Sequence, residues 1–214
     1  MNARNEVWIP CGTLSLEGVL EYPGEAVGAR GAAVICHPHP LFGGNMHNNV
    51  VRALRKALLD RDLVCLRFNF RGTGASWGAH GHGTDEIQDV IAALDFLQQQ
   101  PGVDREKLLV SGYSFGCWVA LAAAAGDARP ARLVGISPPL NEMDFSFLKN
   151  EHRPKFLVVG DSDFVCSEAH FRKLLEEIPE PKVGVVLPNT DHFHVGREHM
   201  FVREMNTFLD TYPL

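Results

Sequence analysis

The feature that most restricts the fold of this 214-residue chain is a regular alternation of short apolar runs with longer stretches of helical periodicity. Strands that alternate with helices predict an α/β fold with a mostly parallel sheet, because parallel strands need helical crossovers. Residues 14–22 alternate in a way that is typical of an edge strand. The other predicted strands are 7–10, 32–36, 63–70, 108–113, 132–136, 156–159 and 183–187, and the predicted helices are 48–62, 85–100, 115–125, 168–178 and 197–209.

Length and organisation indicate one domain over residues 1–214, without repeats, low-complexity segments or a linker. The longest stretch without clear periodicity is 137–154, which contains Pro138 and Pro139. That stretch is too short to form a separate lid domain. We therefore expect a site with little cover.

Charge and cysteine usage exclude several classes of protein. The net charge of −6 argues against nucleic acid as a partner, because phosphate binding needs clustered Lys and Arg. The five cysteines are odd in number and show no CxxC spacing, so we expect them to be reduced. No apolar run approaches the roughly 18 residues of a membrane span, and the first residues lack the apolar core of a signal peptide. These features predict a cytoplasmic protein that does not bind membranes, and they leave its oligomeric state open.

The central chemical signal is Gly112-Tyr113-Ser114-Phe115-Gly116, which follows an apolar strand and opens a helix. In such a strand–turn–helix setting, glycines on both sides of the serine let strand and helix approach closely, and the serine hydroxyl is exposed as a nucleophile. A glycine-rich βα turn with an incidental serine is the alternative interpretation. Ser114 is the predicted nucleophile.

A serine nucleophile needs a histidine base, and the base needs an acid that orients it. After Ser114 the chain offers Asp161 and Asp163 behind one strand, and His192 and His194 behind the last strand. Both pairs stand at carboxyl ends of strands, where active sites of open α/β sheets form. Within each pair the residues alone leave the choice open, except that we expect His194 to be a partly exposed loop residue.

Acyl transfer also needs amide donors for the oxyanion. One donor is expected from Phe115, which follows the nucleophile, and the other from the loop after strand 32–36. Pro38 and Pro40 carry no amide hydrogen, so His39 or Leu41 must supply it there.

Two other motifs resemble ligand-binding sites but are interpreted as loop and turn residues. A metal site built from His37 and His39, with His80, His82, His192 or His194, lacks a carboxylate or cysteine at ligand spacing, so we expect loop histidines around a polar cleft and no metal or cofactor. The stretch 71–76 lacks the ending of a phosphate-binding loop and is predicted to be a tight turn.

Four stretches of the chain resemble a subgroup of small, lidless bacterial α/β-hydrolases related to dienelactone-hydrolase-like and serine-aminopeptidase-like proteins. These stretches are 37–44 (HPHPLFGG), 70–76 (FRGTGAS), the Gly-Tyr-Ser-Phe-Gly turn and Asp191-His192-Phe193. The resemblance covers nearly the whole chain. It implies a three-layer fold with an eight-stranded, mostly parallel sheet whose second strand is antiparallel, and no lid domain.

The same resemblance favours one residue from each pair of candidates for the site. The family pattern Gly-x-x-Asp-x-x-Val carries the acid, and it favours Asp163, three residues after Gly160, although Cys166 replaces the valine. The family's catalytic histidine precedes an aromatic residue, which matches His192. Relatives carry His-Gly where this chain has His37-Pro38, so His39 becomes the expected oxyanion donor and Leu41 the fallback.

These observations predict a serine hydrolase that cleaves small carboxylic esters or thioesters through an acyl-enzyme, using Ser114, Asp163 and His192. The dienelactone branch uses a cysteine nucleophile, so lactone chemistry of that type is not implied. A peptidase or amidase of the same fold is the enzymatic alternative. A non-catalytic small-ligand-binding protein on a hydrolase scaffold is the alternative from another class.

Overall fold

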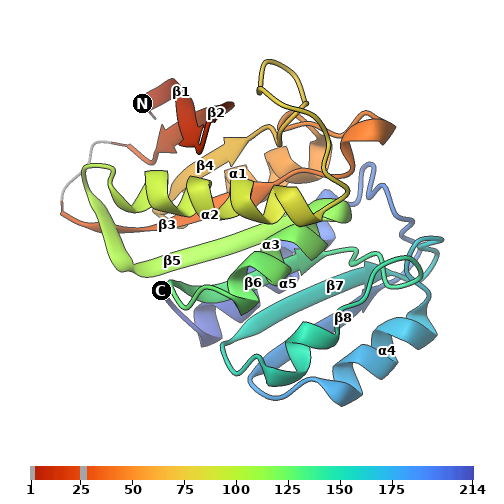
Figure 1. Cartoon of the computed structure of the whole chain (residues 1–214). Helices are drawn as coiled ribbons and strands as arrows, with labels where there is room; N and C mark the ends of the chain where they lie inside the picture. The colour runs from red at the N-terminus through yellow and green to blue at the C-terminus, as the bar shows by residue number, and fades with distance from the viewer. Residues whose placement is uncertain (1–2, 25–27) are drawn as a thin grey trace.

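The computed structural model describes residues 3–24 and 28–214, and an eight-stranded sheet runs through it in the order β1-β2-β4-β3-β5-β6-β7-β8 (Figure 1). β2 is antiparallel to both of its neighbours, β1 and β4, and the pairs from β4 to β8 are parallel. This confirms the predicted α/β-hydrolase architecture. The strands are β1 (Ala3–Cys11), β2 (Leu14–Tyr22), β3 (Arg30–Cys36), β4 (Val64–Phe68), β5 (Val103–Tyr113), β6 (Pro130–Ile136), β7 (Lys155–Gly160) and β8 (Lys182–Leu187).

The prediction that residues 14–22 form an edge strand is wrong. β1 occupies the edge and pairs with β2 along its whole length, from Ala3 opposite Tyr22 to Cys11 opposite Leu14. β2 alternates because the leucines on one of its faces pack in the first apolar cluster, and not because it lacks a partner.

Helices cover the sheet on both faces and complete a three-layer arrangement (Figure 1). On one face α2, α3 and α4 bury an apolar cluster against alternate residues of the strands, and on the other face α1 and α5 bury a second cluster. Because strand side chains alternate between faces, the strands from β3 to β8 contribute to both clusters, whereas β1 and β2 contribute to the first cluster only. The helices are α1 (Asn49–Asp60), α2 (Thr84–Gln98), α3 (Phe115–Ala125), α4 (Glu168–Glu177) and α5 (Glu198–Thr211).

The segment between β6 and β7 contains the short 3₁₀ helix η2 (Ser146–Asn150) and no lid domain. All five cysteines lie in the described part of the chain, where they are free and buried. Across residues 3–24 and 28–214, no helix combines the length and the apolarity that crossing a membrane requires.

Candidate active site

Ser114 lies at a sharp turn between β5 and α3, at the carboxyl end of the parallel strands. Its backbone has φ +54° and ψ −122°, a conformation that non-glycine residues rarely adopt and that functional sites tend to hold. A Cβ on Gly112 would collide with the Gly116 carbonyl oxygen, and one on Gly116 would collide with that of His37. The two glycines of the motif therefore let β5, α3 and the end of β3 meet closely around the serine.

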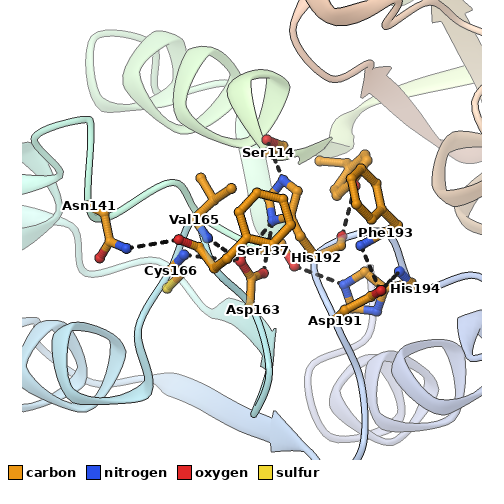
Figure 2. Close-up of polar contacts among 12 residues, drawn as sticks. Ser114, Ser137, Asn141, Asp163, Val165, Cys166, Asp191, His192, Phe193 and His194 are labelled. Carbon is orange, nitrogen blue, oxygen red and sulfur yellow. Dashed lines mark hydrogen bonds and ion pairs between the residues drawn. The ribbon is translucent and has the colours of Figure 1, made fainter.

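A continuous hydrogen-bonded chain runs from Ser114 through His192 to Asp163 (Figure 2). His192 Nε2 lies 2.9 Å from Ser114 Oγ, and His192 Nδ1 lies 2.9 Å from both carboxylate oxygens of Asp163. An ionised carboxylate only accepts hydrogen bonds, so the imidazole proton lies on Nδ1 and Nε2 is free to accept from the serine hydroxyl. All three side chains are more than nine-tenths buried.

The surroundings of Asp163 favour its ionised form. Burial alone would raise the pKa of this carboxyl. The bond from His192, the imidazole charge, the Val165 amide and the Ser137 hydroxyl together outweigh burial and lower the pKa. Two backbone amides donate to its Oδ1, that of Val165 at 2.9 Å and that of Cys166 at 3.0 Å.

Beside Asp163, Ser137 and His194 form a second hydrogen-bonded pair (Figure 2). Ser137 Oγ lies 2.8 Å from His194 Nε2, and the Ser137 hydroxyl is near enough to Asp163 to lower the pKa of its carboxyl. With its hydrogen directed toward this carboxylate, the hydroxyl accepts from His194 Nε2 through its oxygen. His194 is completely buried, which corrects the prediction of a partly exposed loop residue. Burial lowers the pKa of His194 to about 4, so its ring is neutral near pH 7.

Tyr113, the residue before Ser114, helps to fix the histidine loop. Its hydroxyl donates to the His192 carbonyl at 2.8 Å, and its ring is buried. On the other side of His192, Asp191 Oδ1 accepts from the amides of Phe193 and His194. The backbone of His192 is thus fixed from the nucleophile turn and from within its own loop.

Sequence reasoning missed Tyr113 and Ser137. Ser137 directly follows β6, and this position at a strand's carboxyl end is the signal that could have drawn attention to it.

Asp161, the competing aspartate, is turned away from His192. Its carboxylate accepts from the amide of Asn189 at 2.9 Å and that of Thr190 at 3.3 Å, and so ties two loops together. Bonding of backbone amides is a common role of aspartate in loops.

The oxyanion candidates differ in position. Phe115 is the first residue of α3, where amides lack intrahelical acceptors and the helix dipole is positive. His39 lines the same cavity as Ser114, and its ring packs on that of Phe115 with centroids 4.7 Å apart. Leu41 is exposed and lines a neighbouring cavity, and its amide donates to His39 Nδ1 at 3.2 Å.

His37 is part of the framework and not a residue of the polar cleft. It is completely buried, its Nε2 accepts from the Phe70 amide at 3.0 Å, and its Nδ1 bonds the Pro38 carbonyl oxygen at 2.7 Å. Both ring nitrogens are thus occupied by backbone groups. This histidine joins the ends of β3 and β4 beneath the site.

An open cavity of about 560 Å³ lies over Ser114 and His192, and its size is typical of small-molecule sites. Its walls are mainly apolar and aromatic, and Glu142 is the only acidic residue among the described ones that line it. Several of the aromatic side chains are exposed at the rim, including Phe42, Phe164 and Phe193. The apolar and aromatic lining residues include Phe42, Phe115, Pro139, Met143, Phe164, Val165 and Phe193.

Comparison with known proteins gives the same class of protein as the fold and the Ser–His–Asp geometry. Residues 50–134 match the prolyl oligopeptidase family. An α/β serine hydrolase homologue from Coxiella burnetii superposes with a TM-score of 0.85 and 31% identity, covering 94% of both chains. A lidless α/β serine hydrolase from Xanthomonas campestris superposes with a TM-score of 0.86 and 29% identity, covering 100% of this chain and 96% of its own.

An uncharacterized protein from Rickettsia prowazekii is 35% identical over 187 residues, which are 84% of this chain and 78% of that protein. The chain belongs to the α/β-hydrolase superfamily, among its lidless serine hydrolase homologues. More distant relatives include a thiohydrolase from Aspergillus aculeatus, 32% identical over 129 residues, which are 58% of this chain and 38% of that protein.

Proposed function

We propose that this protein hydrolyses carboxylic ester or thioester bonds of small molecules through an acyl-enzyme formed on Ser114. The observation that carries the proposal is the chain Ser114–His192–Asp163, whose contacts of 2.9 Å have the proton directions that nucleophilic catalysis requires.

In the first half-reaction, His192 Nε2 takes the hydroxyl proton as Ser114 Oγ attacks the acyl carbon. Asp163 holds the proton on Nδ1 and stabilises the imidazolium that forms. The protonated His192 then gives its proton to the departing alcohol or thiol. In the second half-reaction, water attacks the acyl-enzyme by the same steps and releases the carboxylic acid.

We assign the oxyanion to the amides of Phe115 and His39. Leu41 is the weaker candidate, because its amide already donates to the His39 ring and its side chain lies outside the cavity of Ser114. A pair of preorganised amides of this kind contributes about 3 kcal/mol or more of transition-state stabilisation.

The cavity favours an apolar or aromatic acyl group. Its lining offers phenylalanine rings and few polar side chains, and the open rim admits a leaving group of varied size. The similarity to a thiohydrolase supports thioesters among the substrates.

A fluorophosphonate probe tests the nucleophile. We expect covalent labelling of the wild type at Ser114 and none of Ser114→Ala, with loss of p-nitrophenyl ester turnover in the same variant. Ser162→Ala is the matched control, because Ser162 is an exposed serine whose hydroxyl donates only to the Asp161 carboxylate. Labelling at another residue, or equal turnover by Ser114→Ala, would contradict the assignment. A wild type that shows neither labelling nor turnover would favour a non-catalytic binding role.

Aminopeptidase activity is a second candidate with its own observations. Residues 50–134 match a peptidase family, and Glu142 brings a carboxylate to the cavity, where a substrate ammonium group could pair with it. Cleavage of aminoacyl p-nitroanilides, lost on N-acetylation of the substrate and weakened in Glu142→Gln, would support this candidate. Equal or faster turnover of neutral esters in Glu142→Gln would support the esterase proposal.

A further inference from the structure

A second cavity, of about 250 Å³, is lined by five cationic or potentially cationic residues: Arg4, His47, Arg52, Arg55 and Arg67. They come from β1, from the loop before α1, from α1 itself and from β4. No carboxylate lines this cavity within the described residues. In a chain whose net charge is −6, such a concentration of positive charge calls for an explanation.

The floor of the cavity is built around a buried guanidinium. Arg67 is 5% exposed, and its Nη1 donates to the Met46 carbonyl and contacts His47 Nδ1, each at 3.0 Å. One carboxylate, that of Glu21, serves two arginines: it lies 2.6 Å from Arg55 Nη1 and 3.4 Å from Arg67 Nε. A buried charge is expensive unless it is paired, so Glu21 accounts for the position of Arg67.

Glu21 does not account for the remaining positive charge. Neither Arg4 nor Arg52 forms an ion pair with any residue that the structure describes. Arg55 Nε is buried and has no acceptor among those residues. Burial, and then the charges of Arg67, Arg4 and Arg52, lower the pKa of His47, while Glu17 opposes them. Like charges that face one cavity repel each other, and an anion in the cavity would relieve this repulsion.

We propose that this cavity binds a phosphate-type oxyanion through the guanidinium groups of Arg4, Arg52 and Arg55. Guanidinium donors that converge from two separate elements suit a tetrahedral dianion, which offers several oxygens, better than a carboxylate with two. Arg67 remains with Glu21 and supplies background charge. The ligand is either free phosphate or a phosphate carried by the leaving group of the substrate, and the second source rests on the proposed function.

The second source has a structural basis in the loop that precedes α1. Gly43 and Gly44 line both the cavity over Ser114 and an intermediate cavity of about 630 Å³. His47 lines both that intermediate cavity and the basic one. The three cavities are thus neighbours along one loop, and a long polar leaving group could reach from the nucleophile to the arginines.

The first test measures phosphate binding without any substrate. Thermal unfolding is followed with increasing inorganic phosphate, with chloride at matched ionic strength as the reference. We expect a saturable rise of Tm for the wild type and for Arg172→Gln, whose arginine is exposed on α4 and unconnected to the cavity. In the double variant Arg4→Gln/Arg52→Gln, both exposed, we expect phosphate affinity to fall at least about tenfold. No saturable rise in the wild type, or an equal rise in the double variant, would overturn the proposal.

The second test distinguishes the two sources. KM is compared for S-acetyl pantetheine 4′-phosphate and S-acetyl pantetheine, which differ only in the phosphate. A lower KM for the phosphorylated thioester, lost in the double variant while kcat for the uncharged thioester is kept, identifies a substrate phosphate. Equal KM values together with phosphate binding in the first test identify free phosphate. If neither thioester is hydrolysed, the substrate phosphate is rejected as the source, p-nitrophenyl ester turnover still decides the proposed function, and the first test still decides whether the anion site exists.

Discussion

Replacing Ser137 with alanine would test whether the hydrogen-bonded pair beside Asp163 contributes to the chemistry or only to folding. The substitution removes one oxygen from a completely buried position and adds no backbone strain, because serine already carries a Cβ at φ +47°. Two groups lose a partner. Asp163 loses the nearby hydroxyl that lowers the pKa of its carboxyl, and His194 Nε2 loses its hydrogen-bond partner.

The two losses have different expected magnitudes and different observables. A buried donor without an acceptor destabilises a fold by about 1–3 kcal/mol, so the free energy of unfolding should fall by that amount through His194. Asp163 keeps both backbone amides and His192, so it loses one charge-assisted bond of about 1.5 kcal/mol. If the lost interaction also stabilises the transition state, kcat/KM falls about tenfold.

A second variant separates the two effects. In Ser137→Ala/His194→Phe the unpaired imidazole is also removed, and an apolar ring of similar size takes its place. Replacing both partners of a buried hydrogen bond with apolar groups can be nearly neutral, so stability should return toward the wild-type value. The tenfold loss in kcat/KM should persist, because Asp163 still lacks the hydroxyl.

Urea unfolding and hydrolysis of a p-nitrophenyl ester measure the two quantities on the same preparations. Recovery of kcat/KM together with stability in the double variant would refute the reasoning, since it would show that Ser137 acts through folding alone. An unchanged kcat/KM in Ser137→Ala would refute it directly.

Three further changes have defined outcomes. Tyr113→Phe removes the hydroxyl that holds the His192 carbonyl and should lower kcat by several-fold to about tenfold with little change in KM, as steady-state kinetics would show. Gly116→Ala places a Cβ against the His37 carbonyl, so far-UV circular dichroism and Tm should report severe destabilisation or no folded protein. Burial lowers the pKa values of His37 and His194 to about 4, so the unfolded chain binds protons before the folded protein does as the pH falls below 6.5. The free energy of unfolding should therefore fall by about 2–3 kcal/mol per histidine between pH 7.5 and 4.5. His194→Phe should roughly halve this fall, as urea titrations at the two pH values would measure.

Much of this fold could be predicted from the sequence, because alternation in a half-buried strand, continuous apolar runs in buried strands and helical spacing are strong local signals. Residues 14–22 and 115–125 agree with β2 and α3 at both ends. The order of residues along the chain does not show which strands pair in the sheet. The strand before residue 14 looked short because its outer residues are polar, yet it forms the whole edge of the sheet. Alternation reports burial of one face, and it does not report which strand lies alongside.

The same limit applies to the site. Ser114 and His192 could be named from motif and order, because their spacing along the chain reflects the succession of strand ends. His194 was expected to be partly exposed, since loops after strands usually lie at the surface. Its burial depends on Ser137, which comes from a strand two places away in the sheet, and on packing against the Phe201 ring, with centroids 5.4 Å apart. Contacts between residues so distant along the chain leave no local pattern.

Three of the six described non-glycine residues with a positive φ belong to these two hydrogen-bonded groups. Ser114, Ser137 and His194 have φ values of +54°, +47° and +55°, although each carries a Cβ. Such conformations are destabilising by about 1 kcal/mol or more each, and they persist only where other contacts hold them. Each strained residue here directs a polar side chain to another member of its group, and none of the three is a glycine, which would adopt the same φ without strain but offer no side chain. The fold therefore retains strained residues where a hydroxyl or an imidazole is needed, and that is the expected signature of side chains kept for their chemistry and not for the turn.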